Sequence, residues 1–354
     1  MKPAQKLPFF LLSAVALAVL PLVLQSHGHA WVRIIDIALL YVLLALGLNI
    51  VVGFAGLLDL GYIAFYAVGA YLFALLASPH LTENLPAVAA MFPDGLHMPI
   101  WVVIPLGAGL AALAGVLLGA PTLRLRGDYL AIVTLGFGEI IRVFLNNMDM
   151  PVNITNGPKG IDRIDALSIG GVSLGEPWTI AGFTLPPVTL HYYLFLGLVV
   201  LAVIASARLN DSRLGRAWRA VREDEIAAKA MGLNTRNLKL LAFGLGATFG
   251  GVAGVLFASF QGFVSPESFS LQESVMVVAM VVLGGLGHVR GVILGAFLLA
   301  ALPEVLRHMA GPLQAMTDGR LDASILRQLL VALAMIGIML ARPRGLWPAP
   351  EGKA

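Results

Sequence analysis

Windows of about twenty apolar residues recur along almost the whole of this chain, with short polar segments between them. A helix of that length and composition crosses the hydrocarbon core of a bilayer, so each window predicts a membrane-spanning helix. Charged residues make up only 12% of the chain, against about 25% in soluble domains, which excludes a water-soluble protein. The windows are residues 7–25, 33–52, 57–77, 99–120, 128–147, 190–207, 238–260, 273–288, 291–308 and 324–341.

These windows predict an all-α integral membrane protein of ten spans, forming one domain over residues 1–354. The first window has a longer apolar run than a signal peptide, so it is expected to be a retained helix. Glycine-rich segments at 53–56 and 284–291 join two pairs of windows, which makes these pairs candidates for broken or re-entrant helices. Their places in the two five-span halves suggest two inverted five-helix repeats.

Positive charge is distributed unevenly between the windows. With both termini in the cytoplasm, sixteen Lys and Arg residues fall in cytoplasmic segments and four in outer segments, as the positive-inside rule requires. The excess of Lys and Arg over Asp and Glu therefore does not indicate nucleic-acid binding. Residues 78–98 and 148–189 become outer loops, the second with a hairpin expected near 169–172. Their acidic residues could dock a basic protein surface or simply be solvated: Glu83, Asp94, Asp162, Asp165 and Glu176.

One polar segment, residues 208–239, holds eight of the 23 Lys and Arg residues. Within it the acidic run Glu223, Asp224 and Glu225 suits the positive end of a helix dipole, and Gly232 suits a left-handed cap, which predicts a helix over about 225–231. That helix is too short to be stable alone, and one face is apolar, so it needs a groove to lie in or a membrane surface to rest on. The face comprises Ile226, Ala227, Ala230 and Met231. Residues 208–222 are interpreted as a topology anchor at the membrane surface.

The pattern Ala227, Ala228, three residues, Gly232 resembles the coupling loop of ABC importer permeases. Further segments resemble the LivM-type permease of branched-chain amino acid ABC importers, and they cover most of the chain from about residue 40 to the tail at 342–347. They are GFAGLLDLG at 53–61 with Gly69 and Tyr71, LRGDYL at 125–130, TLGFGEIIR at 134–142, NGPKGI at 156–161, RAVREDEIAAKAMG at 219–232, GGLG at 284–287 and RPRGLW at 342–347.

This resemblance implies a permease subunit in a bacterial-type cytoplasmic (inner) membrane, with two ABC ATPase subunits, a second homologous permease and an extracytoplasmic substrate-binding protein as partners. Permeases for urea and short amides are similar, so they remain an alternative. The sequence has no G-x-x-x-x-G-K-[ST] phosphate loop, so ATP is expected to be used by the partner subunit and no cofactor by this chain. The residues expected to couple to the ATPase are Glu223, Asp224, Glu225, Ile226, Ala227, Ala228, Met231 and Gly232.

Ionisable residues inside the windows mark candidate positions on a translocation path, because an unpaired charge in a bilayer is costly. Glu139 and Arg142 are three residues apart, as are Glu304 and Arg307, which also permits simple internal neutralisation. The path residues proposed from sequence are Asp59, Tyr66, Thr134, Glu139 and Arg142. Glycines repeat at four-residue spacing at Gly115/Gly119, Gly246/Gly250/Gly254 and Gly291/Gly295, which favours close helix packing.

Two other classes of function are compatible with some of these features. A self-sufficient secondary transporter or channel would also have ten spans and buried carboxylates, but it does not need the polar segment at 208–239. An integral membrane enzyme is disfavoured, because the seven His residues are scattered and no catalytic set can be assembled. The sequence contains no Cys, and no convincing metal site is expected.

Overall fold

The computed structural model describes residues 15–25, 28–92, 95–122, 125, 127–169, 172–180, 183–316, 323–342 and 345–347, and these are mostly helical. The membrane-region helices are Val15–Gln25, α2 (His29–Leu48), η1 (Asn49–Phe54), α3 (Ile63–Leu76), α6 (Ile100–Thr122), α7 (Asp128–Asn147), α8 (Pro187–Asp211), α11 (Thr235–Gln261), α12 (Leu271–Gly284), α13 (Val289–Met316) and α14 (Ala323–Ala341). Helices outside these are α4 (His80–Asn84), α5 (Pro86–Met91), η2 (Gly157–Lys159), α9 (Arg213–Glu223), α10 (Glu225–Ala230) and η3 (Pro266–Phe269). Two short hairpins pair β1 (Ser168–Ile169) with β2 (Val172–Ser173), and β3 (Trp178–Ile180) with β4 (Phe183–Leu185).

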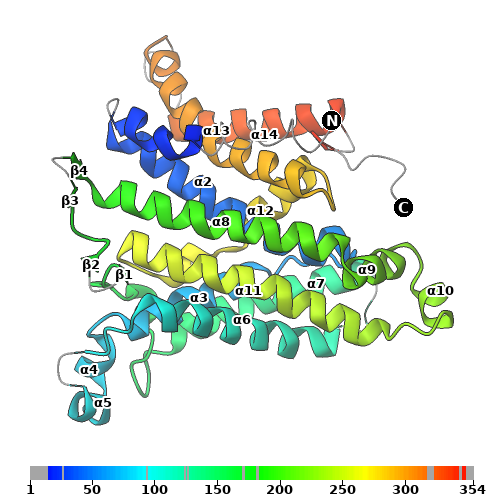
Figure 1. Ribbon diagram of the computed structural model, residues 1–354, viewed down its shortest axis with the longest axis horizontal. Helices are drawn as coiled ribbons and strands as arrows, with labels where there is room; N and C mark the ends of the chain where they lie inside the picture. Colours follow the sequence, from blue (N-terminus) through cyan, green and yellow to red (C-terminus); the bar gives the residue numbers. More distant parts are fainter. Residues whose placement is uncertain are drawn as a thin grey trace.

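Long helices run side by side along the long axis of the molecule (Figure 1). Among the described residues, five helical stretches are long and apolar enough to cross a membrane by length and composition: His29–Phe54, Ile100–Thr122, Pro187–Asp211, Thr235–Gln261 and Pro266–Gly284. Every window marked on the sequence overlaps a helix, and the chain is a multi-pass membrane protein. The hairpin expected near 169–172 is present as β1 and β2.

Two of the predicted spans are shorter than expected. The window 57–77 becomes helical only at Ile63, so α3 has 14 residues. Helix α12 runs from Leu271 to Gly284, also 14 residues, and reaches a spanning length only together with η3. At 1.5 Å per residue such a helix is about 21 Å long, less than the ~30 Å hydrocarbon core. Before α3, the amide of Leu60 bonds to Thr134 Oγ1 and the amide of Gly61 to Asp59 Oδ1, which draws the chain out of the helical hydrogen-bond pattern. After α12, Gly285 adopts a positive φ of 116°, which ends the helix.

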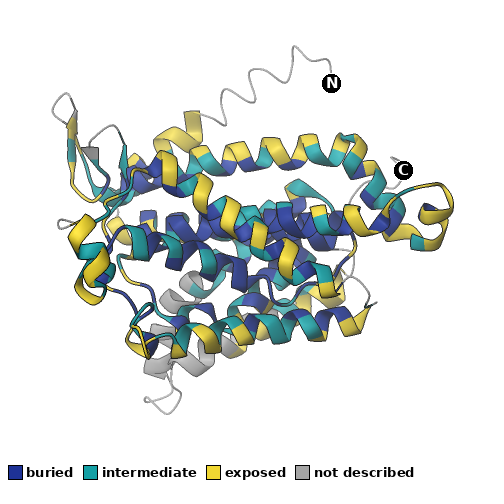
Figure 2. Ribbon diagram, turned by 90° about the horizontal axis from the view of Figure 1, so that it is seen from below, coloured by how far each residue is buried: buried dark blue, intermediate teal, exposed yellow. Residues whose placement is uncertain are grey.

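Helix α11 lies at the centre of the bundle, between α3 and α6. Its glycines are required by close contact: a Cβ on Gly254 would overlap the carbonyl oxygen of Tyr66 on α3, and a Cβ on Gly251 would overlap the carbonyl oxygen of Gly107 on α6. The four-residue glycine spacing therefore serves helix packing, as predicted. The buried residues are concentrated along this central axis (Figure 2).

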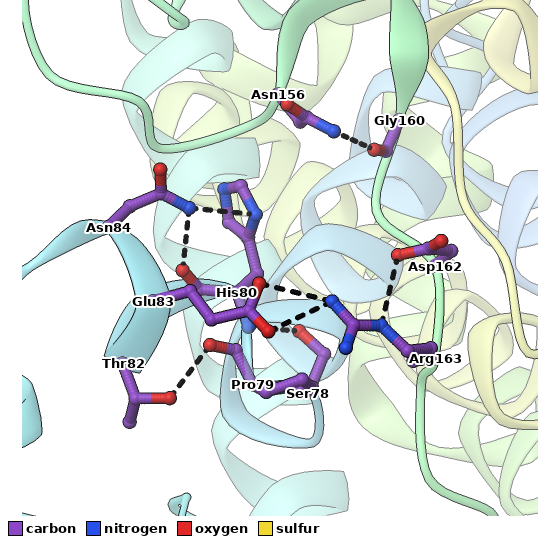
Figure 3. A network of polar contacts seen from close by, with 10 residues as sticks. All are labelled: Ser78, Pro79, His80, Thr82, Glu83, Asn84, Asn156, Gly160, Asp162 and Arg163. Carbon is purple, nitrogen blue, oxygen red and sulfur yellow. Dashed lines mark hydrogen bonds and ion pairs between the residues drawn. The ribbon is translucent and has the colours of Figure 1, made fainter.

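The segments predicted as outer loops gather at one end of the bundle, with the hairpins and helices α4 and α5 (Figure 1). An ion pair joins the two loops: Arg163 Nη2 donates to both carboxylate oxygens of Glu83, at 2.9 and 3.0 Å, and Arg163 Nε lies 3.7 Å from Asp162 Oδ1 (Figure 3). His97 Nδ1 lies 2.5 Å from Asp165 Oδ2. Three of the loop acids are thus paired within this chain, Glu176 is exposed, and Asp94 lies outside the described residues.

At the opposite end, the two glycine breaks contact each other. The amide of Gly287 donates to Asn49 Oδ1 at 2.9 Å, which joins the turn after α12 to η1. The described residues of the C-terminal tail lie here too, because the amide of Trp347 donates to the carbonyl of Gly284 at 3.2 Å. Equivalent breaks in an inverted repeat would lie at opposite ends, so these two glycine breaks do not support the repeat.

Candidate functional site

A helical arm, residues 212–234, projects from the end of the bundle that holds the glycine breaks (Figure 1). It contains the expected short helix, observed as α10, and a second helix, α9, that was not predicted from the sequence. The topology anchor predicted at residues 208–222 is a more ordered element than expected, since 213–222 are helical and α9 packs on the bundle through the fully buried Trp218.

Both ends of α10 are capped as its sequence predicts. Asp224 Oδ1 accepts hydrogen bonds from the amides of Ile226 and Ala227, at 2.8 and 3.0 Å. At the other end Gly232 has φ 84°, and its amide donates to the carbonyl of Lys229 while the amide of Leu233 donates to that of Ala228. These two bonds form a Schellman motif, so the conformation of α10 is set within the segment itself.

Glu225 fixes α10 to the bundle. Its carboxylate pairs with Lys229 at 3.0 Å and with Lys239, at the start of α11, at 2.8 Å, and it accepts a hydrogen bond from Thr235 Oγ1 at 3.2 Å. Burial acts to raise the pKa of Glu225, but the hydrogen bonds and charges of Lys239 and Lys229 outweigh it and lower the pKa to about 2. Glu225 therefore stays ionised and paired at neutral pH.

The apolar face of α10 has no cover within the described part of the chain. Ala228 is buried against the arm, whereas Ile226 and Met231 are 68% and 84% exposed, and Ala227 and Ala230 are exposed with them. Figure 2 shows this exposed tip at the end of the molecule. A capped helix that keeps large apolar side chains in solvent is a surface that fits a partner. Glu223, at the end of α9, is exposed as well.

Helix α9 connects this surface to the glycine breaks. Trp218 Nε1 donates to the carbonyl of Leu238 at 2.7 Å, and Arg222 Nη1 donates to the carbonyl of Gly53 in the last turn of η1. The stem of Arg222 also fills the space beside Gly56, where a Cβ would be 2.6 Å from Arg222 Cγ. The arm, η1 and the turn at Gly287 therefore form one contact network.

The two charged residues predicted on α7, Glu139 and Arg142, form a cluster with a third residue, Glu267 of η3, which was not predicted. Arg142 Nε donates to both oxygens of Glu139, at 3.0 and 3.2 Å, and Arg142 Nη1 donates to Glu267 Oε1 of η3 at 2.9 Å. The side chains of Glu139 and Glu267 are 43% and 66% exposed in this chain. The same helix exposes bulky apolar side chains: Tyr129, Ile132, Ile140, Val143 and Phe144.

Comparison with known proteins identifies the family of the chain. The sequence matches the family described as branched-chain amino acid transport system / permease component over residues 31–340. The chain belongs to this family. It is 42% identical to the high-affinity branched-chain amino acid transport system permease protein LivM of Escherichia coli K12, over 97% of this chain and 75% of that protein. It is 24% identical to LivH of the same organism, over 88% of this chain and 92% of that protein. No solved structure matches the chain.

The remaining path residues proposed from sequence lie inside this permease. Asp59 and Thr134 are 1% and 4% exposed, and Thr134 accepts from the amide of Leu60 and donates to the carbonyl of Ala131, at 3.0 and 3.1 Å. Through these contacts Thr134 supports the irregular segment before α3, and Asp59 supports it through Oδ1, which accepts from the amide of Gly61. Asp59 Oδ2 is buried with no hydrogen-bond partner among the described residues. Tyr66 is 7% exposed and packs against Phe257 and Phe269, with ring centroids 5.3 Å away in each case. The side chains of Glu304 and Arg307 lie outside the described residues.

Proposed function

We propose that this chain is a membrane-spanning permease subunit of an ABC importer, forming part of the path for branched-chain amino acids, with ATP hydrolysed by a separate subunit. The relatives at 42% and 24% identity carry names of branched-chain amino acid permeases, and the helical arm supplies the one feature a self-sufficient carrier does not need. The observation that carries the proposal is the exposed apolar face of a rigid, doubly capped α10.

The ATPase docks on α10 in this proposal. Ile226, Ala227 and Met231 enter a cleft on the ATPase, while Asp224, Glu225 and Gly232 hold the helix in shape and Ala228 seats it on the arm. Because Glu225 ties α10 to Lys239 of α11, movement of the ATPase displaces the cytoplasmic end of the bundle as well as the arm.

The proposed topology has ten spans with both termini in the cytoplasm of a bacterial cell and the protein in its inner membrane. The arm, both glycine breaks and the tail at Trp347 lie at one end, and the two loops predicted to be outside lie at the other. Two inverted five-helix repeats remain part of the proposal on a different basis. The 14-residue helices α3 and α12 are the third and eighth spans, and each follows an irregular segment. The segment before α3 reaches the first turn of α12, since Ser274 Oγ donates to the carbonyl of Leu60.

A second, homologous permease is proposed to cover α7. Glu139, Arg142 and Glu267 are only partly buried here, and charges facing lipid are unfavourable, so this face requires protein or water beside it. Pairing two permeases across α7 would place the cluster on a central path. The substrate-binding protein would deliver its solute at the end formed by the loops at 78–98 and 148–189.

Cysteine cross-linking tests the docking, since the native sequence has no Cys. Ala227→Cys on the exposed face of α10 is expected to cross-link to the co-expressed ATPase carrying single cysteines along its cleft. Glu176→Cys, equally exposed but at the opposite end, is the matched control and should give no cross-link.

Transport in proteoliposomes tests the activity. Leucine uptake is expected only when the permease pair, the ATPase, the binding protein and ATP are all present. Uptake by this chain alone would instead establish a secondary transporter, and uptake of urea or acetamide without leucine would establish the short-amide alternative.

A further inference from the structure

A cavity of about 160 Å³ lies between α2, α3 and α11, at the end of the bundle near the outer loops. Its walls are apolar or aromatic and include Leu40, Tyr41, Tyr66, Phe257 and Phe260, with Gln261 at the rim. A second hollow of about 230 Å³ lies between α2, α12 and α13, and Ile37 and Tyr41 line both. An engineered apolar cavity of about 150 Å³ accepts benzene, so the first cavity is large enough for a branched four-carbon side chain.

Opposite charges flank the cavity. Arg33 lies 5.3 Å from the centre of the Phe260 ring, and its Nη2 donates to Gln261 Oε1 at 2.5 Å. Glu273 Oε2 accepts a hydrogen bond from the Tyr41 hydroxyl at 2.7 Å. Each charged group therefore contacts a residue of the cavity wall: the Arg33 guanidinium contacts Gln261 and Phe260, and the Glu273 carboxylate contacts Tyr41.

This combination matches one class of solute. An apolar cavity alone would take any small hydrocarbon group, and the two charges alone would take any zwitterion. Together they match an amino acid with an apolar side chain, whose ammonium and carboxylate leave the same carbon atom. Charge-assisted hydrogen bonds are the strong ones in such a site, and the guanidinium is suited to bind a carboxylate with two parallel bonds.

We propose that this cavity is a binding site for a hydrophobic amino acid within the single permease chain. The side chain occupies the space against Tyr66 and Phe257, the carboxylate binds Arg33 in place of Gln261, and the ammonium binds Glu273. The inference rests on the proposed function for its substrate class and adds a site that family membership does not place. It also gives Tyr66 a role as part of the cavity wall.

The location suits early binding from the outside. Gln261 ends α11, and the next residues contact the large outer loop, since the amide of Ile164 donates to the carbonyl of Gly262 at 3.3 Å. Arg33 is exposed at the same end of α2. A solute released at the outer loops would therefore meet Arg33 and Gln261 before the deeper aromatic wall.

Binding of radiolabelled leucine to the purified complex in nanodiscs tests the site. Ile37→Trp, which fills the shared wall of the two hollows, is expected to weaken leucine binding at least tenfold, as are Arg33→Gln and Glu273→Gln. Leu106→Trp, at an exposed position on α6, is the matched control for added bulk, and Arg163→Gln is the control for a lost outer arginine; both should bind as the native protein does. Isovalerate and isobutylamine, which each lack one charge, should compete at least tenfold more weakly than leucine.

Alkylation gives a measurement that leaves the charges intact. Ile37 is 37% exposed, so Ile37→Cys should react with a maleimide, and leucine should slow that reaction whereas isovalerate should not. Phe263→Cys, exposed nearby but outside both hollows, should react at the same rate with or without leucine. Leucine binding unchanged in Ile37→Trp, or no leucine protection of Ile37→Cys in a complex that transports leucine, overturns the site while leaving the proposed function in place. A complex that carries urea instead of leucine overturns the substrate of the proposed function, and leucine protection then fails with it.

Discussion

The N-cap of α10 offers a sharp test of the docking surface, because one side chain holds the helix start. Asp224 Oδ1 accepts two amide hydrogen bonds, and α10 has only six residues, too few to be helical without help. Replacing a capping Asp by Ala costs about 0.5–2 kcal/mol of helix stability, typically about 1. If the ATPase binds α10 only as a helix, Asp224→Ala should weaken its binding about fivefold, with about thirtyfold as the upper bound.

The affinity of the purified ATPase for the permease in nanodiscs, measured by biolayer interferometry, gives the result directly. Asp224→Asn is the matched control, since Asn caps a helix about as well as Asp but carries no charge. The asparagine variant should bind as the native protein does. Equal binding by Asp224→Ala and the native protein would refute the cap as a determinant of docking. Equally weak binding by the alanine and asparagine variants would show that charge, and not helix capping, is what the ATPase requires.

Three further outcomes follow from the structure. Arg222→Met keeps the apolar stem beside Gly56 but removes the donor to Gly53, so leucine uptake per ATP hydrolysed in proteoliposomes should fall at least tenfold. Arg219→Met is the control and should leave this ratio unchanged, because among the described residues the Arg219 guanidinium bonds to the nearby carbonyl of Asn210 alone. Gly254→Ala should lower the thermal unfolding temperature by forcing α3 from α11. Gly109→Ala should stabilise its helix by about 0.5–1 kcal/mol, because an added Cβ there meets no described atom within 4 Å outside the backbone of its own helix. The pKa of Glu225 is lowered in the folded protein, so its pairing with Lys239 and Lys229 stabilises the arm fully above the ordinary pKa of a Glu and is lost only as the pH falls towards 2. The affinity of the native protein for the ATPase should therefore not change through this group between pH 8 and pH 5. Glu225→Gln should weaken that affinity at every pH in the same range.

The parts of this molecule that are predictable from sequence are those determined by nearby residues. Asp224 and Gly232 define the ends of α10 within nine residues of each other, so the amino-acid sequence alone correctly predicts the helix. Helix α9 is missed although its signal is present: Leu214, Trp218 and Val221 recur at helical spacing. The four arginines interleaved with them favour an interpretation as positive-inside charge. Burial of the tryptophan depends on Leu238, which lies beyond α10 in α11.

The candidate path residues show why the rest is not predictable. An apolar window predicts that a segment lies in the membrane, but not which side of it faces a neighbouring helix. Thr134 is grouped with Glu139 on sequence because they share a helix, yet its partner is the amide of Leu60, 74 residues earlier in the chain. Arg142 has a partner on its own helix, which the spacing predicts, and a second one, Glu267, that comes from a short 3-10 turn with no sequence signal.

The inner end of the bundle is built so that displacement of the arm cannot stay local. Arg222 bonds to a backbone carbonyl in the last turn of η1, and the amide of Gly287 bonds to Asn49 in its first turn. If α9 moves and η1 does not, the Gly53 carbonyl loses its donor, and a buried backbone group left unpaired costs about 1–3 kcal/mol. If η1 follows α9, the Asn49 bond carries the turn between α12 and α13 with it. The outer end has no comparable link to the arm among the described residues, and its loops are fastened by their own ion pairs. Movement of α10 should therefore displace η1 and the turn between α12 and α13 together, and so open and close the inner end of the bundle, while the outer loops keep their structure.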